Sequence, residues 1–144
     1  MERLIVDTGI WYALLDKTDS KAKFADRIMD IIKNHELLIP YPSLYETINT
    51  RFIKNEYQQA DKLFSFLNKR EKVKLVPDDE YRKKALASVQ FNLTRGKHYS
   101  LVDMIIRLMM EDNQLGPRAV LTFNVKDFCG INAISVIDPS RLVD

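Results

Sequence analysis

The chain has few residues that could form covalent or metal cross-links. Cys129 is its single cysteine, and His35 and His98 are its only histidines. One cysteine cannot form an internal disulfide, and one cysteine with two histidines cannot build the usual tetrahedral zinc site. A chain of 144 residues is nevertheless long enough to fold around an apolar core. We therefore expect a single domain over residues 1–144 in a reducing, cytoplasmic setting.

Long apolar runs are also lacking. No run approaches the roughly 18 residues that would span a membrane, and Met1-Glu2-Arg3 leads directly into a short apolar run instead of the apolar stretch of a signal peptide. We therefore expect no membrane contact. The chain also lacks a strong excess of either charge: it has 22 Lys and Arg and 20 Asp and Glu, which gives a net charge of +2. That balance neither demands nor excludes a polyanionic partner.

Glycine is scarce as well, with four residues in the chain. Neither of the two common glycine-rich phosphate-binding loops is present, which excludes nucleotide kinases and nicotinamide enzymes. A phosphatase of the haloacid dehalogenase type needs Asp-x-Asp at the end of the first strand, and Gly9 occupies the place of the second acid. Ser43 and Ser100 have no histidine partner by motif, which argues against a serine nucleophile.

Apolar and amphipathic segments alternate along the chain. Short apolar runs, typical of strands buried in a parallel sheet, occur at 4–6, 37–39 and 119–122. A short edge strand is expected over 73–76 and a last strand over 133–137. Apolar residues at helical spacing predict helices over 21–35, 43–52, 57–67, 78–95 and 100–111. Phe64 and Leu86 are expected to face the core. The alternation predicts an α/β fold, a three-layer α/β/α sandwich with a central parallel sheet of four or five strands.

A carboxylate follows the first strand directly. Asp7 comes after Val6, and in open α/β sheets ligands bind outside the carboxyl ends of the strands. Asp7 is therefore a candidate site residue. In the alternative interpretation, Asp7 or Thr8 simply caps the helix that follows. The sequence leaves both interpretations open.

Two further acids occupy the fourth position of a capping motif, which ordinarily satisfies free amides at a helix start. The motifs are Ser43-Leu44-Tyr45-Glu46 and Ser100-Leu101-Val102-Asp103. Both predicted helices follow loops of a parallel α/β frame, so we expect Glu46 and Asp103 in first turns near the strand end that carries Asp7. Asn124 and Asp127 follow another strand and supply oxygen ligands at the same edge.

Together these motifs resemble the PIN domain over nearly the whole chain and, in size, the single-domain toxin ribonucleases of the VapC type. The matching stretches are Val6-Asp7-Thr8 with Trp11-Tyr12, Ser43-x-x-Glu46, Ser100-Leu101-Val102-Asp103 and Leu121-Thr122-x-Asn124-x-x-Asp127-Phe128. The resemblance implies a metal-dependent endoribonuclease that cleaves single-stranded RNA. It also implies that Asp7, Glu46 and Asp103 hold Mg²⁺ or Mn²⁺. The fourth family position, often Asp, falls on Asn124, with Asp127 shortly after it.

The chemistry of these side chains agrees with the resemblance. Mg²⁺ takes oxygen ligands and is usually held by one or two carboxylates together with water and substrate phosphate. Asp7 and Asp103 would suffice for one ion, while Glu46 would orient a water or assist a second ion. Without metal, clustered carboxylates repel one another, so one or more of them should have a raised pKa.

The resemblance also implies partners. Toxins of this type are encoded beside a small antitoxin and commonly form homodimers. We expect an antitoxin helix to lie on the helical hairpin over residues 43–67, which offers Tyr57, Phe64 and Phe66. Candidate contacts for RNA phosphates are Arg51, Lys54, Lys69, Arg70, Arg95 and Lys97. Two alternatives remain open: a PIN-like binding or docking module without strong nuclease activity, and an RNA-maturation endonuclease with no antitoxin.

Overall fold

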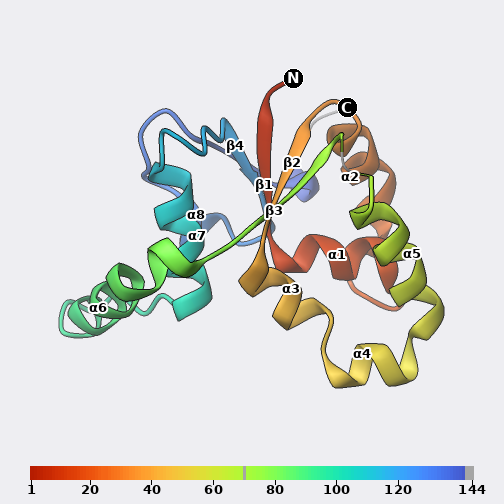
Figure 1. Ribbon diagram of the computed structural model, residues 1–144, viewed down its shortest axis with the longest axis horizontal. Helices are drawn as coiled ribbons and strands as arrows, with labels where there is room; N and C mark the ends of the chain where they lie inside the picture. The colour runs from red at the N-terminus through yellow and green to blue at the C-terminus, as the bar shows by residue number, and fades with distance from the viewer. Residues whose placement is uncertain (70, 142–144) are drawn as a thin grey trace.

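A five-stranded, fully parallel sheet forms the centre of the computed structural model, which describes residues 1–69 and 71–141. The strands are β1 (Arg3–Val6), β2 (Glu36–Pro40), β3 (Val73–Val76), β4 (Ala119–Leu121) and β5 (Ser135–Ile137). Their order across the sheet is β3-β2-β1-β4-β5 (Figure 1). The predicted parallel sheet is therefore confirmed, with the higher of the two expected strand numbers.

Helices cover both faces of this sheet, as the predicted three-layer sandwich requires (Figure 1). They are α1 (Thr8–Leu15), α2 (Ala25–Ile32), α3 (Tyr41–Thr47), α4 (Thr50–Asn55), α5 (Tyr57–Leu67), α6 (Arg82–Leu93), α7 (Leu101–Glu111) and α8 (Val125–Phe128). Short 3₁₀ helices are η1 (Ala22–Phe24), η2 (Asp79–Tyr81) and η3 (Pro139–Arg141). No described helix is long and apolar enough to cross a membrane.

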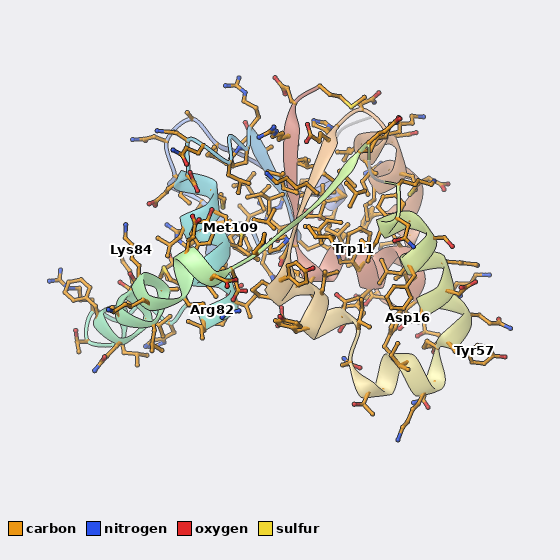
Figure 2. All side chains as sticks on the ribbon, in the orientation of Figure 1. Trp11, Asp16, Tyr57, Arg82, Lys84 and Met109 are labelled. Atoms are coloured by element: carbon orange, nitrogen blue, oxygen red, sulfur yellow. The ribbon has the colours of Figure 1, made fainter. Side chains whose placement is uncertain are left out.

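The two faces of β1 belong to separate hydrophobic cores. Leu4 packs in the core that also contains Trp11, whereas Ile5 packs in the core that contains Met109. Trp11 and Met109 lie on the two sides of the sheet (Figure 2). Successive side chains of a strand point to opposite faces, so a strand with both faces covered must be apolar throughout. This is why the sequence of β1 contains a continuous apolar run.

The strand order reverses between β1 and β4. The chain moves outward from β1 through β2 to β3, then returns to the other side of β1 with β4 and β5. Val6 at the end of β1 pairs with Leu121 at the end of β4. In doubly wound sheets such a reversal opens a crevice at the carboxyl ends of the two strands. The residues that follow Val6 and Leu121 therefore meet at the place where this fold class binds ligands.

Three helices differ from the prediction in their boundaries. The helix expected over 78–95 consists of η2 and the shorter α6. The helix expected over 43–52 begins at Tyr41 and is divided into α3 and α4. Proline is tolerated in the first turn of a helix because that turn does not use its N–H, so Pro42 lies inside α3. Asn49 ends the continuity, since its side chain accepts a hydrogen bond from the Phe52 N–H at 2.9 Å and caps α4. The helix expected over 21–35 is likewise shorter, consisting of η1 and α2.

Two side chains expected in the core are exposed instead. Leu86 is 62 % exposed because α6 projects away from the sheet (Figure 1), and Ala85 is the buried residue of that helix. On α5, Phe64 is 44 % exposed. Phe66 packs inward instead, edge-on to Trp11 with 5.6 Å between ring centroids. The prediction that Phe66 belongs to the outer surface of the hairpin is therefore wrong.

Candidate active site

Asp7 lies at the reversal point of the sheet and has two fixed carboxylate oxygens. Its Oδ1 accepts a hydrogen bond from the Thr8 N–H at 2.8 Å, so Asp7 caps α1. Its Oδ2 accepts a hydrogen bond from the Thr122 hydroxyl at 2.7 Å. The cap interpretation is therefore confirmed, and it leaves the other oxygen facing the end of β4, so Asp7 stays a candidate site residue. The residue is only 6 % exposed.

Burial raises the pKa of Asp7 from 3.8 to about 6. Hydrogen bonds from Thr122 and Thr8 act in the opposite direction, and the negative charges of Asp103 and Glu46 raise the pKa further. The predicted raised pKa is confirmed for this carboxyl. Its main cause differs from the expected one, since loss of hydration outweighs repulsion between the acids.

Glu46 is held beside Asp7 by helix α1, although not by the predicted cap. Its Oε1 accepts a hydrogen bond from the Thr8 hydroxyl at 2.8 Å, and its carbonyl accepts one from the Tyr12 hydroxyl at 2.8 Å. Glu46 stands near the end of α3 and not in its first turn, because the helix begins at Tyr41. Thr8 thus connects the capped start of α1 to the carboxylate of Glu46.

The predicted capping role of Ser43 is wrong. Ser43 lies inside α3 and is fully buried, and its hydroxyl has no hydrogen-bond partner within the described part of the chain. A cap residue replaced by Ala typically loses about 1 kcal/mol, whereas removal of a buried, unpaired hydroxyl removes a desolvation penalty. We expect Ser43→Ala to leave the free energy of unfolding unchanged or higher, as measured by urea denaturation. Ser100→Ala is the comparison that should lose stability.

Asp103 does occupy the first turn of its helix. The Ser100 hydroxyl accepts a hydrogen bond from the Asp103 N–H at 3.0 Å, which confirms the predicted cap of α7. Burial is the largest influence raising the pKa of Asp103, Ser100 lowers it through hydrogen bonding, and the charges of Asp127 and Glu46 raise it. The charge of Glu46 therefore acts on both Asp103 and Asp7.

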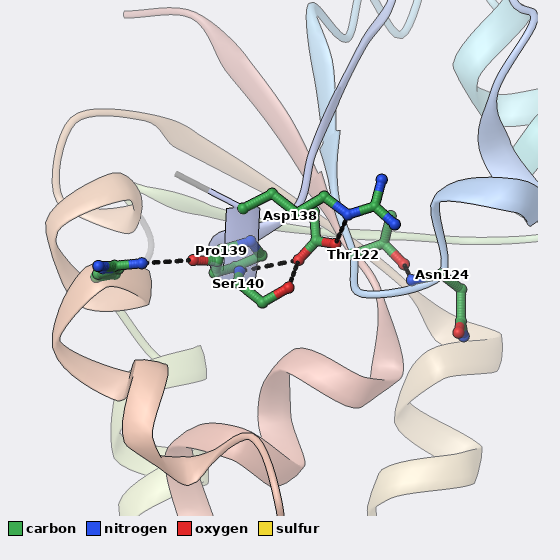
Figure 3. A network of polar contacts seen from close by, with 7 residues as sticks. Thr122, Asn124, Asp138, Pro139 and Ser140 are labelled. Atoms are coloured by element: carbon green, nitrogen blue, oxygen red, sulfur yellow. Dashed lines mark hydrogen bonds and ion pairs between the residues drawn. The ribbon is translucent and has the colours of Figure 1, made fainter. Parts of the chain in front are cut away.

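The segment after β4 brings Asn124 and Asp127 to this edge. The Asn124 N–H donates to the Thr122 hydroxyl oxygen at 2.9 Å (Figure 3), so Thr122 connects this turn to Asp7. Asp127 lies in α8, and its charge acts on Asp103. Arg107 fixes α8 against α7, because its guanidinium donates to the carbonyls of Asp127 at 2.9 Å and Cys129 at 3.2 Å. Sequence patterns gave no signal for this role of Arg107.

The acids are suited to a hard divalent cation, although their side chains are not arranged around one. Within residues 1–69 and 71–141, no group of three or more His, Cys, Asp and Glu side chains is close enough to hold a metal ion. Asp7, Glu46 and Asp103 nevertheless influence one another electrostatically. Their donors are all oxygens, and Mg²⁺ needs only one or two carboxylates besides water and phosphate. The residues present therefore fit Mg²⁺ or Mn²⁺.

The candidate phosphate contacts are distributed widely. Arg51 lines a cleft of about 290 Å³ together with Tyr12, whose hydroxyl bonds to Glu46. Lys69 lies by Phe66 in a groove at the amino ends of β2 and β3, the edge opposite the acids. The Arg95 guanidinium stacks on Phe91 at 4.1 Å from the ring centroid. The remaining candidates are Lys54 in α4, Lys97 in the loop before α7, and Arg70, which lies outside the described residues.

Only solved structures, and neither family models nor curated sequences, match this chain. Mycobacterium tuberculosis VapC20, described as a sarcin-ricin loop cleaving toxin, matches with a TM-score of 0.62 and 20 % identity, over 81 % of this chain and 86 % of that one. A chain of VapBC2 from Rickettsia felis, solved bound to a promoter DNA fragment, matches with a TM-score of 0.60 and 17 % identity, covering 94 % and 97 %.

A third solved structure gives the same result. A chain of the FitAcB structure from Neisseria gonorrhoeae matches with a TM-score of 0.59 and 16 % identity, covering 96 % of this chain and 99 % of that one. At these identities the likeness concerns the fold. The chain therefore shares its fold, over most of its length, with these three solved structures, and the predicted three-layer α/β/α fold is confirmed.

Proposed function

We propose, from this fold and the acids at its reversal point, that the chain is a metal-dependent endoribonuclease that cleaves single-stranded RNA. The observation that carries the proposal is the buried Asp7 carboxyl, whose pKa is raised to about 6 at the switch point of the sheet and which feels the charges of Asp103 and Glu46. The proposal gains support from VapC20, which shares the fold and is described as a sarcin-ricin loop cleaving toxin. The decisive assay is Mg²⁺-dependent RNA cleavage and its loss in Asp103→Asn.

In this proposal Asp7 and Asp103 hold Mg²⁺ or Mn²⁺, which would supply a more acidic water and offset charge on the phosphate. Thr122 and Thr8 keep the two oxygens of Asp7 in place. Glu46 is exposed and anchored by Thr8, so it orients the attacking water beside Asp7. Asp127 is the fourth acid, held in position by the contacts of Arg107 with α8.

We further propose that this nuclease is the toxin of a toxin-antitoxin pair. VapBC2 and FitAcB, which share the fold, support this assignment. A homodimer is part of the same proposal, by resemblance to such toxins. The antitoxin would bind at an apolar groove of about 370 Å³ between α3 and α5, which Tyr45 and Phe64 line as exposed aromatic residues. An amphipathic helix with its apolar face buried fits such a groove.

Phe64→Glu should weaken antitoxin binding by about tenfold or more, because it places a charge in the groove that the apolar helix face would cover. RNA cleavage should be retained, since Phe64 lies on α5 away from the acids. Gln58→Glu adds the same charge to the same helix and serves as the control. Tyr57→Glu should have the smaller effect: Tyr57 is 68 % exposed, points outward from α5 (Figure 2) and does not line the groove.

Binding is measured by copurification and titration with the product of the neighbouring small gene. If that protein neither copurifies with the chain nor protects cells that express it, the toxin assignment is wrong and only the nuclease proposal remains.

A further inference from the structure

Two aromatic rings lie beside the acid cluster. Phe123 directly follows Thr122, whose hydroxyl donates to Asp7. Its ring lies 3.9 Å from the position that a Cβ on Gly9 would occupy, so it packs against the first turn of α1. Phe24, at the end of η1, is tilted against Phe123 with 6.2 Å between ring centroids. The aromatic pair therefore starts within the candidate active site and extends away from it toward α2.

Three cations surround this pair. The Lys21 ammonium lies 5.3 Å from the Phe123 centroid and 5.9 Å from that of Phe24. Lys23 lies 5.4 Å and the Arg27 guanidinium 5.8 Å from the Phe24 centroid. We call Lys21, Lys23, Phe24, Arg27 and Phe123 the basic-aromatic platform. Arg27 also donates to the Pro139 carbonyl at 3.4 Å, which ties the platform to the segment after β5 (Figure 3).

The two lysines of the platform are not neutralised by nearby acids. Neither Lys21 nor Lys23 forms an ion pair with any residue that the structure describes. Asp19 uses its Oδ1 to accept a hydrogen bond from the Lys21 backbone N–H at 2.9 Å, so its role is to shape the turn. The platform therefore places positive charge beside the candidate active site, which contains Asp7, Glu46 and Asp103.

This arrangement matches what a single nucleic-acid strand requires. Proteins bind single strands by combining cations that follow the phosphates with aromatic rings on which bases stack. The acids of the candidate active site repel a polyanion, so attraction has to come from adjacent residues. The contact between Lys69 and Phe66 does not meet this need, because it lies at the amino edge of the sheet.

We propose that the basic-aromatic platform binds the RNA strand next to the scissile phosphate, with Lys21, Lys23 and Arg27 contacting phosphates and a Phe ring stacking a base. This inference rests on the proposed nuclease function. The platform residues are positioning residues for the substrate, separate from the acids that act on the phosphate.

The test compares two double variants that remove the same charge. Lys21→Gln with Lys23→Gln changes the platform, whereas Lys33→Gln with Lys72→Gln changes residues just before β2 and β3, at the opposite edge of the sheet. Binding of a labelled single-stranded RNA is measured by anisotropy at several salt concentrations, in the Asp103→Asn background so that the RNA stays intact. Cleavage kcat/KM is measured in the otherwise unchanged protein.

The platform variant should bind RNA about tenfold or more weakly. Its slope of log K against log salt should fall by about 1.4, because each lost phosphate contact contributes roughly 0.7 for a single strand. The variant at the opposite edge should bind and cleave as the unchanged protein does. Phe24→Leu keeps an apolar side chain but removes the ring, and it should weaken binding at least about fivefold.

The two proposals can fail separately. Cleavage and binding that respond equally to both double variants would overturn the platform and leave the nuclease proposal standing. RNA binding that depends on the platform in a protein that never cleaves RNA would overturn the nuclease proposal and leave the platform standing.

Discussion

Asp7→Asn and Asp103→Asn should each lower RNA cleavage by at least about a hundredfold. Loss of a residue that merely supports a metal ligand typically reduces metal affinity or activity 10–100-fold, and a direct ligand should matter at least as much. An amide keeps the size of the side chain but loses the charge that holds a divalent cation. The measurement is the single-turnover cleavage rate of a labelled single-stranded RNA in Mg²⁺, with chelator added as the metal-free reference.

Asp138→Asn provides a matched control for these variants. Asp138 also follows a strand at the carboxyl edge of the sheet and is also buried. Its carboxylate is engaged elsewhere: Oδ1 accepts hydrogen bonds from the Ser140 N–H at 2.9 Å and from its hydroxyl at 2.6 Å, and Oδ2 pairs with Arg141 at 3.3 Å (Figure 3). The folded Asp138→Asn protein should cleave RNA at the unchanged rate.

Wild-type cleavage rates in both Asp7→Asn and Asp103→Asn would show that the catalytic assignment is wrong. If the unchanged protein neither cleaves RNA nor gains thermal stability in millimolar Mg²⁺ or Mn²⁺, the chain is better described as a docking module of the same fold.

The strands were predictable because a strand that is buried on both faces is apolar at successive positions of the sequence. Leu4, Ile5 and Val6 must all be apolar in the centre of a covered sheet, and the pattern is visible without knowledge of the neighbours. Helix phase is less local. On α5, Ala60 and Leu63 are buried as expected. The aromatic residue that packs inward is Phe66 and not Phe64, because Phe66 meets Trp11 of α1.

The places of Asp7 and Asp103 in the fold were predictable, whereas the residues that position them were not. Asp7 and Asp103 stand at a strand end and in a helix first turn, which short motifs reveal. The bond from Thr122 to Asp7 joins residues 115 apart in the sequence, and Arg107 reaches the carbonyls of α8 from α7. Such contacts depend on how the elements pack, so no local pattern predicts them.

The stability of the metal-free protein should decrease as pH rises from about 4 to about 6. The pKa of Asp7 is about 6 in the folded protein, against an ordinary value of 3.8. Between these values the folded protein keeps a proton that the unfolded chain has released, so the free energy of unfolding falls with rising pH and then levels off. A shift of about two pKa units corresponds to about 3 kcal/mol.

Asp7→Asn should remove the contribution of Asp7 to this dependence, because an amide does not titrate, while the raised pKa of Asp103 contributes in both proteins. The variant should therefore gain stability relative to the unchanged protein as pH rises from 4 to 8, by up to about 3 kcal/mol, less any loss from its altered bonds to Thr8 and Thr122. Other carboxyls titrate in both proteins: the pKa of Asp78 is lowered by the hydrogen bond from Arg82, and its effect cancels in the difference. The measurement is urea unfolding of both metal-free proteins at pH 4, 6 and 8.

Addition of Mg²⁺ or Mn²⁺ at pH 8 should then recover the stability of the unchanged protein by mass action, since a cation bound only to the folded state favours that state. Asp7→Asn should show no such recovery. If the two proteins lose and gain stability in parallel across the pH range, with and without metal, the Asp7 carboxyl is not the buried, titrating group described above and its assignment as a metal ligand is wrong.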